Sequence, residues 1–117
     1  MQIEVKGRNC PVTAETRERV ERRFDKVAKQ VSELARLEVE LHEEQNPANP
    51  DRHVAEVTLH LKGVTLRAVE ATRDMDHSIN LVSEELARQV KRHREKRRKR
   101  REARAARPGA EGVQPAV

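Results

Sequence analysis

The sequence is almost free of aromatic residues, because Phe24 is the only one and there is no tryptophan or tyrosine. Modules that bind single-stranded nucleic acid commonly stack its bases on aromatic rings, so this composition argues against a stacking platform. If the chain recognises a polyanion, we expect it to do so through phosphate contacts and shape.

Cysteine is as scarce as the aromatics. Cys10 is the single cysteine, so it can form no disulfide within the chain, and this usage is typical of an intracellular protein. The thiol could act as a nucleophile, but it adjoins Pro11 and the sequence implies no activating histidine nearby. We therefore expect a partly buried cysteine without a catalytic role.

Glycine and long apolar runs are also lacking. The four glycines, at positions 7, 63, 109 and 112, make no phosphate-binding loop. The apolar runs are only a few residues long, so we expect no membrane-spanning segment. The N-terminus lacks the apolar core of a signal peptide, which makes a cytoplasmic location the expectation. The basic run 96–101 would also suit a nuclear-import signal in a eukaryotic protein.

Metal and catalytic signatures are missing as well. None of the five histidines has metal-ligand spacing to a second histidine or a cysteine. Asp74 and Asp76, with Glu70 upstream, could suggest a cation site, but Asp74 suits a helix cap, with Thr72 as the alternative cap, and Asp76 a first-turn acid. We expect no metal, no cofactor, no small-molecule substrate and no enzymatic activity.

Positive charge is concentrated near the C-terminus. Residues 91–107 hold eleven lysines and arginines against two glutamates, a net charge of +9. Residues 1–90 hold fourteen basic and seventeen acidic side chains, a net charge of −3. This imbalance is too large for pairing between helical neighbours to absorb, and it favours contact with a polyanion.

Apolar residues recur at strand or helix spacing in six segments. Alternation predicts strands over residues 2–6, 37–42, 55–62 and 65–71, with a tight hairpin at 62–64. Stripes at spacings of three and four predict a helix over roughly 14–31, capped by Thr13, and another from about 75 to beyond 94.

This order predicts an α+β fold of the type β-α-β-β-β-α, in which a four-stranded, mostly antiparallel sheet carries two helices on one face. The first two strands flank a helix, so we expect them to run parallel through a right-handed crossover. We predict one domain over 1–95, followed over 96–117 by a basic helical extension and a disordered tail.

The two predicted helices could present one shared basic surface. The candidate phosphate-binding residues are Arg22, Arg23, Lys26 and Lys29 on the first helix and Arg88, Lys91, Arg92 and Arg94 on the second. A solvated charged face is the alternative for the first helix, which also carries Glu15, Glu18, Glu21 and Asp25.

Several segments are familiar in detail. Residues 66–75 (LRAVEATRDM), 78–80 (SIN) and 86–93 (LARQVKRH) resemble the ribosome hibernation promoting factor family, which includes the ribosome-associated inhibitor called protein Y. Gly7, Val12, Thr13 and the segment 23–27 (RFDKV) fit the same pattern, so the resemblance covers about residues 1–95.

The resemblance implies a fold similar to double-stranded-RNA-binding domains in its later elements. It implies binding to the 30S subunit and the 70S ribosome through 16S rRNA phosphates, in the channel for messenger RNA and the A- and P-site transfer RNAs. Translation would thereby be inhibited in stationary phase or stress. By position, the family's basic helix residues correspond to Arg23, Lys26, Arg88, Arg92 and Arg94.

The chain departs from the family at Asp76, because an aromatic residue usually follows the Asp-Met step. Long members carry a second, dimerising domain, so this chain is either a short member or part of a long one. Two other functions stay open: a generic binder of double-stranded RNA or DNA, and a module that docks its second helix on a protein. We expect a monomer off the ribosome, because the core uses the apolar stripe of that helix.

Overall fold

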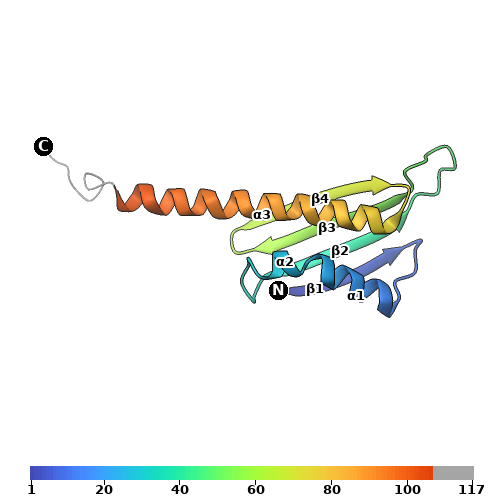
Figure 1. The fold of residues 1–117 in the computed structure, drawn as a ribbon, viewed down its shortest axis with the longest axis horizontal. Helices are drawn as coiled ribbons and strands as arrows, with labels where there is room; N and C mark the ends of the chain where they lie inside the picture. Colours follow the sequence, from blue (N-terminus) through green and yellow to red (C-terminus); the bar gives the residue numbers. More distant parts are fainter. Residues whose placement is uncertain (107–117) are drawn as a thin grey trace, which may run out of the picture.

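The computed structural model describes residues 1–106 as a sheet with helices on one face (Figure 1). The elements, in chain order, are β1 (Gln2–Arg8), α1 (Ala14–Arg23), α2 (Asp25–Ala28), β2 (Arg36–Glu43), β3 (His53–Leu61), β4 (Val64–Thr72) and α3 (Met75–Ala105). The α+β class and the predicted order are confirmed, except that the first helix is divided in two. The predicted disordered tail, residues 108–117, lies outside the described residues.

The sheet has the strand order β1-β2-β3-β4, so neighbours in sequence are neighbours in space. β1 runs parallel to β2, while β2–β3 and β3–β4 are antiparallel, as predicted. The β3–β4 hairpin turns through Lys62 and Gly63, and the positive φ of 78° at Gly63 is a conformation that glycine adopts without strain.

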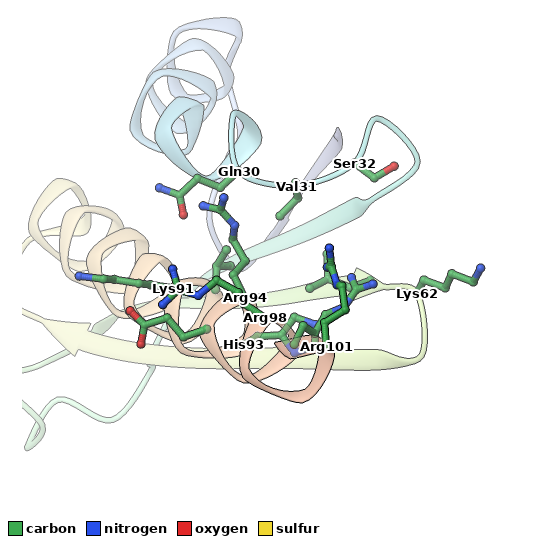
Figure 2. A pocket seen from close by; sticks show the side chains of 13 residues that line it. Gln30, Val31, Ser32, Lys62, Lys91, His93, Arg94, Arg98 and Arg101 are labelled. Atoms are coloured by element: carbon green, nitrogen blue, oxygen red, sulfur yellow. The ribbon is translucent and has the colours of Figure 1, made fainter. Parts of the chain in front are cut away.

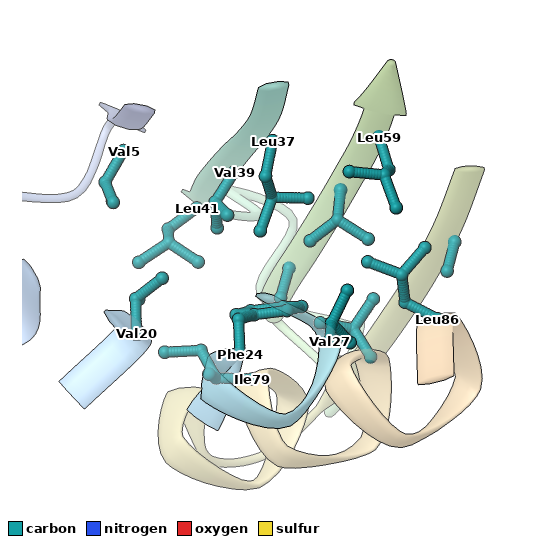
Figure 3. Packing of buried hydrophobic residues seen from close by; sticks show 14 of the residues in the cluster. Val5, Val20, Phe24, Val27, Leu37, Val39, Leu41, Leu59, Ile79 and Leu86 are labelled. Atoms are coloured by element: carbon teal, nitrogen blue, oxygen red, sulfur yellow. The ribbon is translucent and has the colours of Figure 1, made fainter. Parts of the chain in front are cut away.

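The core lies between the sheet and the helices (Figure 3). Each strand buries alternate residues on the helix side, so Leu37, Val39 and Leu41 of β2 are fully or almost fully buried. α1 and α2 contribute Val20, Phe24 and Val27 to this core. α3 contributes Ile79, Val82, Leu86 and Val90, each fully buried. The opposite face of the sheet is uncovered by any helix within residues 1–106 (Figure 1).

The prediction of one helix over 14–31 was wrong. The helix breaks at Phe24, where φ is −97° and ψ is 6°, and α2 then continues only to Ala28. Phe24 is fully buried, so the kink keeps the sole aromatic ring in the core while the chain changes direction. Beyond α2, the hydroxyl of Ser32 accepts a hydrogen bond from the Leu34 amide at 3.1 Å, which favours a turn over further helix.

The start of α3 is fixed by several polar contacts. Asp74 caps the helix by accepting from the His77 amide at 3.2 Å, as the sequence predicted. Ser78 is fully buried, and its hydroxyl donates to the His53 carbonyl of β3 at 2.6 Å. This bond ties the first turn of α3 to the sheet and explains why a polar side chain is tolerated there.

α3 is 31 residues long, which corresponds to roughly 46 Å at about 1.5 Å per residue. Its buried residues end at Val90, and none of residues 91–106 is fully buried. Figure 1 shows the helix passing the β3–β4 hairpin and projecting away from the sheet. No described helix is both long and apolar enough to cross a lipid bilayer.

Candidate nucleic-acid interface

A groove runs between α1–α2 and α3 on the helical side of the molecule. We call it the interhelical groove; its volume is about 460 Å³. It is lined by Arg22, Arg23, Lys26, Val27, Gln30, Asn80, Ser83, Glu84, Ala87, Arg88 and Lys91. Five of the eight candidate residues from the sequence therefore line one surface, although α1 and α2 are separated from α3 by the three strands β2–β4 in sequence.

The groove combines an apolar floor with cationic rims. Val27 and Ala87 pack toward the core, whereas the basic side chains on both rims are exposed. Glu84 is the acidic residue among the lining side chains. Exposed guanidinium and ammonium groups on two facing rims can contact a phosphate backbone that enters between them.

The remaining candidates lie elsewhere. Lys29, which follows the last residue of α2, pairs with Asp25 at 3.0 Å and does not line the groove. Arg94 lines an adjacent pocket between α3 and the segment 30–32, which shares Lys91 with the groove, while Arg92 faces the β4 side of α3. The structure therefore divides the predicted basic surface among three faces around α3.

Glu85 moderates the charge beside the groove. Its Oε1 accepts two hydrogen bonds from Arg88, at 2.9 and 3.1 Å, and its Oε2 accepts one from Gln89 at 3.2 Å. Arg92 lies 3.8 Å from the same carboxylate. The hydrogen bond from Gln89, and next those from Arg88, hold the pKa of the Glu85 carboxyl below its ordinary range. Two candidate arginines thus share one permanently ionised partner at neutral pH.

The two helices that frame the groove are also joined by an ion pair. Arg19 of α1 donates to Asp76 of α3 at 2.7 Å, and the arginine side chain is one-third exposed. The sequence predicted Asp76 only as a first-turn acid, because nothing in the sequence brings positions 57 residues apart together. Asp76 stands where the resembled family usually has an aromatic residue, so a charged contact occupies that place here.

Chemistry other than binding has little support in the described residues. Burial, with a smaller effect from Glu43, raises the pKa of the Cys10 thiol, so it is protonated at neutral pH and a poor nucleophile. Within residues 1–106, no three histidine, cysteine, aspartate or glutamate side chains gather in a way that could hold a metal ion. The interhelical groove remains the candidate site, because it gathers five of the eight predicted cationic residues.

Sequence reasoning missed several residues of this site. Asn80 and Ser83 line the groove, and Ser83 is buried while its hydroxyl donates to the Asn80 carbonyl at 2.7 Å. Their position on α3, on the side facing α1, could have been derived from the helical spacing. The bond from Gln89 to the Arg67 carbonyl of β4, at 2.8 Å, left no signal in the sequence.

The chain matches a family model over residues 3–98, described as Sigma 54 modulation protein / S30EA ribosomal protein. A ribosome hibernation promotion factor from Picosynechococcus sp. is 34% identical over 97 residues, which cover 82% of this chain and 50% of that protein. The ribosome hibernation promoting factor of Salmonella typhimurium is 30% identical over 96 residues, covering 82% of this chain and 96% of the relative. The chain thus spans about half of the longer relative and nearly all of the shorter one.

Solved structures show the same fold. The crystal structure of the Thermus thermophilus protein Y N-terminal domain superposes with a TM-score of 0.70 at 26% identity, covering 80% of this chain and 99% of that one. A ribosomal subunit interface protein from Coxiella burnetii gives a TM-score of 0.66 at 18% identity, covering 80% of this chain and 98% of that one, which shows the fold alone. Together with the matched model, these likenesses confirm the resemblance drawn from residues 66–93: the chain belongs to the Sigma 54 modulation protein / S30EA ribosomal protein family, whose members matched here are ribosome hibernation promoting factors.

Proposed function

We propose that this chain is a ribosome hibernation factor that acts in the cytoplasm by binding, without catalysis. Its partners are the 30S subunit and the 70S ribosome, and its contacts are with 16S rRNA phosphates in the channel for messenger RNA and the A- and P-site transfer RNAs. Occupying that channel blocks translation while the ribosome is idle, in stationary phase or stress.

One observation carries the proposal: two sequence-distant helices place five exposed cations around a single groove. A groove with cations on both rims can hold a folded polyanion in a fixed orientation, whereas a random charged face cannot. The near absence of aromatic rings agrees with recognition through phosphates. Membership of a family whose matched relatives are named for ribosome hibernation supports the identity of that polyanion.

The test is co-sedimentation of the purified chain with vacant 70S ribosomes through a sucrose cushion at two salt concentrations. We expect stoichiometric pelleting at low salt, competition by transfer RNA, and a marked loss of binding as salt rises. Absence of pelleting at low salt, or pelleting that transfer RNA leaves unchanged, would contradict binding in the decoding channel.

The site is tested by matched triple variants. Arg23→Gln/Lys26→Gln/Arg88→Gln removes three of the five cations of the interhelical groove and should weaken ribosome binding roughly 100-fold, at about 1 kcal/mol for each lost phosphate contact. Lys6→Gln/Arg36→Gln/Arg67→Gln makes the same change of charge on the uncovered sheet face and should have a several-fold effect at most. Equal losses in the two variants would remove the groove as the site.

A generic binder of double-stranded RNA or DNA is the alternative, and the cationic rims are compatible with it. It predicts similar affinity for a naked 16-base-pair RNA duplex and for ribosomes at the same salt concentration. We expect the ribosome to bind at least tenfold more tightly, because its folded RNA can contact both rims at once.

A further inference from the structure

The apolar stripe of α3 continues past the edge of the sheet as an arginine stripe. Steps of four, three and four residues lead from Val90 to Arg94, Arg97 and Arg101, which therefore follow the line of Val82 and Leu86. α3 runs on past the β3–β4 hairpin, so these arginines belong to the part of the helix in which no residue is fully buried (Figure 1). They face open space on the side of the helix that points back toward the domain.

That space is a pocket, which we call the hairpin pocket, with a volume of about 550 Å³. α3 forms one wall, while the segment 30–32 and the end of β3 form the others. Val31, Leu61 and Val90 supply an apolar floor, since the first two pack against the core and the third is fully buried. Figure 2 shows the Arg94 side chain rising from α3 toward Gln30, with Lys62 on the hairpin beyond.

The walls of the hairpin pocket are strongly cationic. Six of its side chains are basic: Lys62, Lys91, Arg94, Arg97, Arg98 and Arg101. Glu95 is the acidic lining residue, and Arg98 has a distant partner in Glu102 at 3.8 Å. Within residues 1–106, no carboxylate lies within 4.0 Å of the charged atoms of the other five.

Arg94 with Arg98, and Arg97 with Arg101, are like charges four residues apart, a spacing that destabilises a helix. An anion with several charges relieves this repulsion and can accept two parallel hydrogen bonds from each guanidinium. A single carboxylate is too small to reach both the helix and Lys62, whereas consecutive phosphates extend over several ångströms.

We propose that the hairpin pocket is a second phosphate-binding site, next to the interhelical groove and sharing Gln30 and Lys91 with it, that takes two or more consecutive phosphates. Two sources share this chemistry: the backbone of a single RNA strand and a free polyphosphate such as that of a nucleotide. Phosphate binding in this pocket does not require ribosome binding, so it can be tested independently of the proposed function.

The first experiment is calorimetric titration of the full chain, in low-salt buffer free of phosphate, with sodium tripolyphosphate and with hexauridylate. Arg98→Gln/Arg101→Gln should weaken binding roughly tenfold, because two guanidinium contacts are lost. The matched control Lys99→Gln/Arg104→Gln changes the same charge on the same helix, at positions that line neither the pocket nor the groove, and should stay within about twofold.

A second pair of variants tests the pocket apart from the helix. Lys62→Gln on the hairpin should weaken binding several-fold, whereas Lys6→Gln on the uncovered sheet face should not. Binding of either ligand with these dependences supports the site, and tighter binding of one of the two identifies the source of the phosphates. Equal losses in pocket and control variants, or no binding of either ligand, would overturn it.

The groove variant Arg23→Gln/Lys26→Gln/Arg88→Gln separates this inference from the proposed function. It should keep tripolyphosphate binding within about threefold while it loses the ribosome, because its three positions lie outside the hairpin pocket. If the chain fails to pellet with ribosomes, the proposed function is wrong but the hairpin pocket is unaffected. If the pocket variants have no effect on tripolyphosphate or hexauridylate binding, the pocket is wrong but the proposed ribosome binding is unaffected.

Discussion

The two halves of α3 have opposite surroundings although they belong to one continuous helix. Residues 75–90 place Ile79, Val82, Leu86 and Val90 in the core, and all four are fully buried. Residues 91–105 keep the same three- and four-residue spacing, but arginines take the positions of the apolar residues, and the net charge is +8. The comparison shows that the periodicity of a helix fixes which side chains share a face, while the extent of the sheet decides what that face contacts.

The largest contrast between the halves should be in stability. Leu86→Ala removes a fully buried side chain and should lower the free energy of unfolding by about 3 kcal/mol, as for other large-to-small core substitutions. Arg101→Ala, on the same helix face in the projecting half, should change it by less than about 0.5 kcal/mol. Urea unfolding of the two variants measures both values, and equal effects would mean that the projecting half packs on the domain.

Backbone protection should show the next largest contrast. Amide hydrogens of residues 79–90 should exchange only through unfolding of the domain, because they lie on a packed helix. Those of residues 94–105 should exchange at least 100-fold faster, because none of these residues is buried and like charges favour local opening. Hydrogen exchange followed by NMR gives both rates, and uniform protection along α3 would contradict the contrast.

Much of this contrast could be predicted from the sequence. The spacing of Val82, Leu86 and Val90 and the charge count after residue 90 require only the helical period. The break at Phe24 could not be predicted from the sequence. Apolar residues at steps of four and three are expected both in one continuous helix and in two shorter helices that follow each other. Arg19–Asp76 and Gln89–Arg67 also escaped prediction, since each depends on how the helices and β4 are placed by packing elsewhere.

The candidate site was predicted less completely than the fold. Charge on the helix faces, together with the family resemblance for Arg23, Lys26 and Arg88, selected five residues that the structure brings to one groove: Arg22, Arg23, Lys26, Arg88 and Lys91. Charge alone also selected Lys29 and did not reveal that Asp25 pairs with it. The division of Arg92 and Arg94 between different faces of α3 follows from their rotation around the helix, which a count of basic residues ignores.

Substitution of Glu85, which lies near the junction of the two halves of α3, should have a smaller effect than the changes above, and it should be a gain in RNA affinity. Glu85→Gln should strengthen RNA binding several-fold, because it frees Arg88 and Arg92 from their shared carboxylate. The matched control Glu33→Gln removes an exposed acid outside the groove and should change the affinity by less than twofold. Fluorescence anisotropy with a labelled RNA duplex measures both, and weaker binding by Glu85→Gln would show that the carboxylate orients the arginines.

The smallest expected effect is on the pH dependence of stability. The folded pKa of Glu85 is depressed, so its ionised form stabilises the fold above the ordinary glutamate value of about 4.3, and this contribution disappears as pH falls through the depressed pKa. The stability difference between wild type and Glu85→Gln should therefore be greatest near pH 7 and decrease as pH falls through the depressed pKa. Urea unfolding across this range tests the sign, and a difference that grows on acidification would contradict it.

Cross-linking to the ribosome tests the central claim most directly, namely that the interhelical groove meets ribosomal RNA. In a Cys10→Ser background, Glu84→Cys places a photo-cross-linker in the groove, and Glu56→Cys removes the same charge while placing the probe on the uncovered sheet face. The groove probe should cross-link to 16S rRNA in the channel for messenger and transfer RNA, with little cross-linking from the sheet probe. Stronger 16S rRNA cross-linking from Glu56→Cys than from Glu84→Cys would contradict the account.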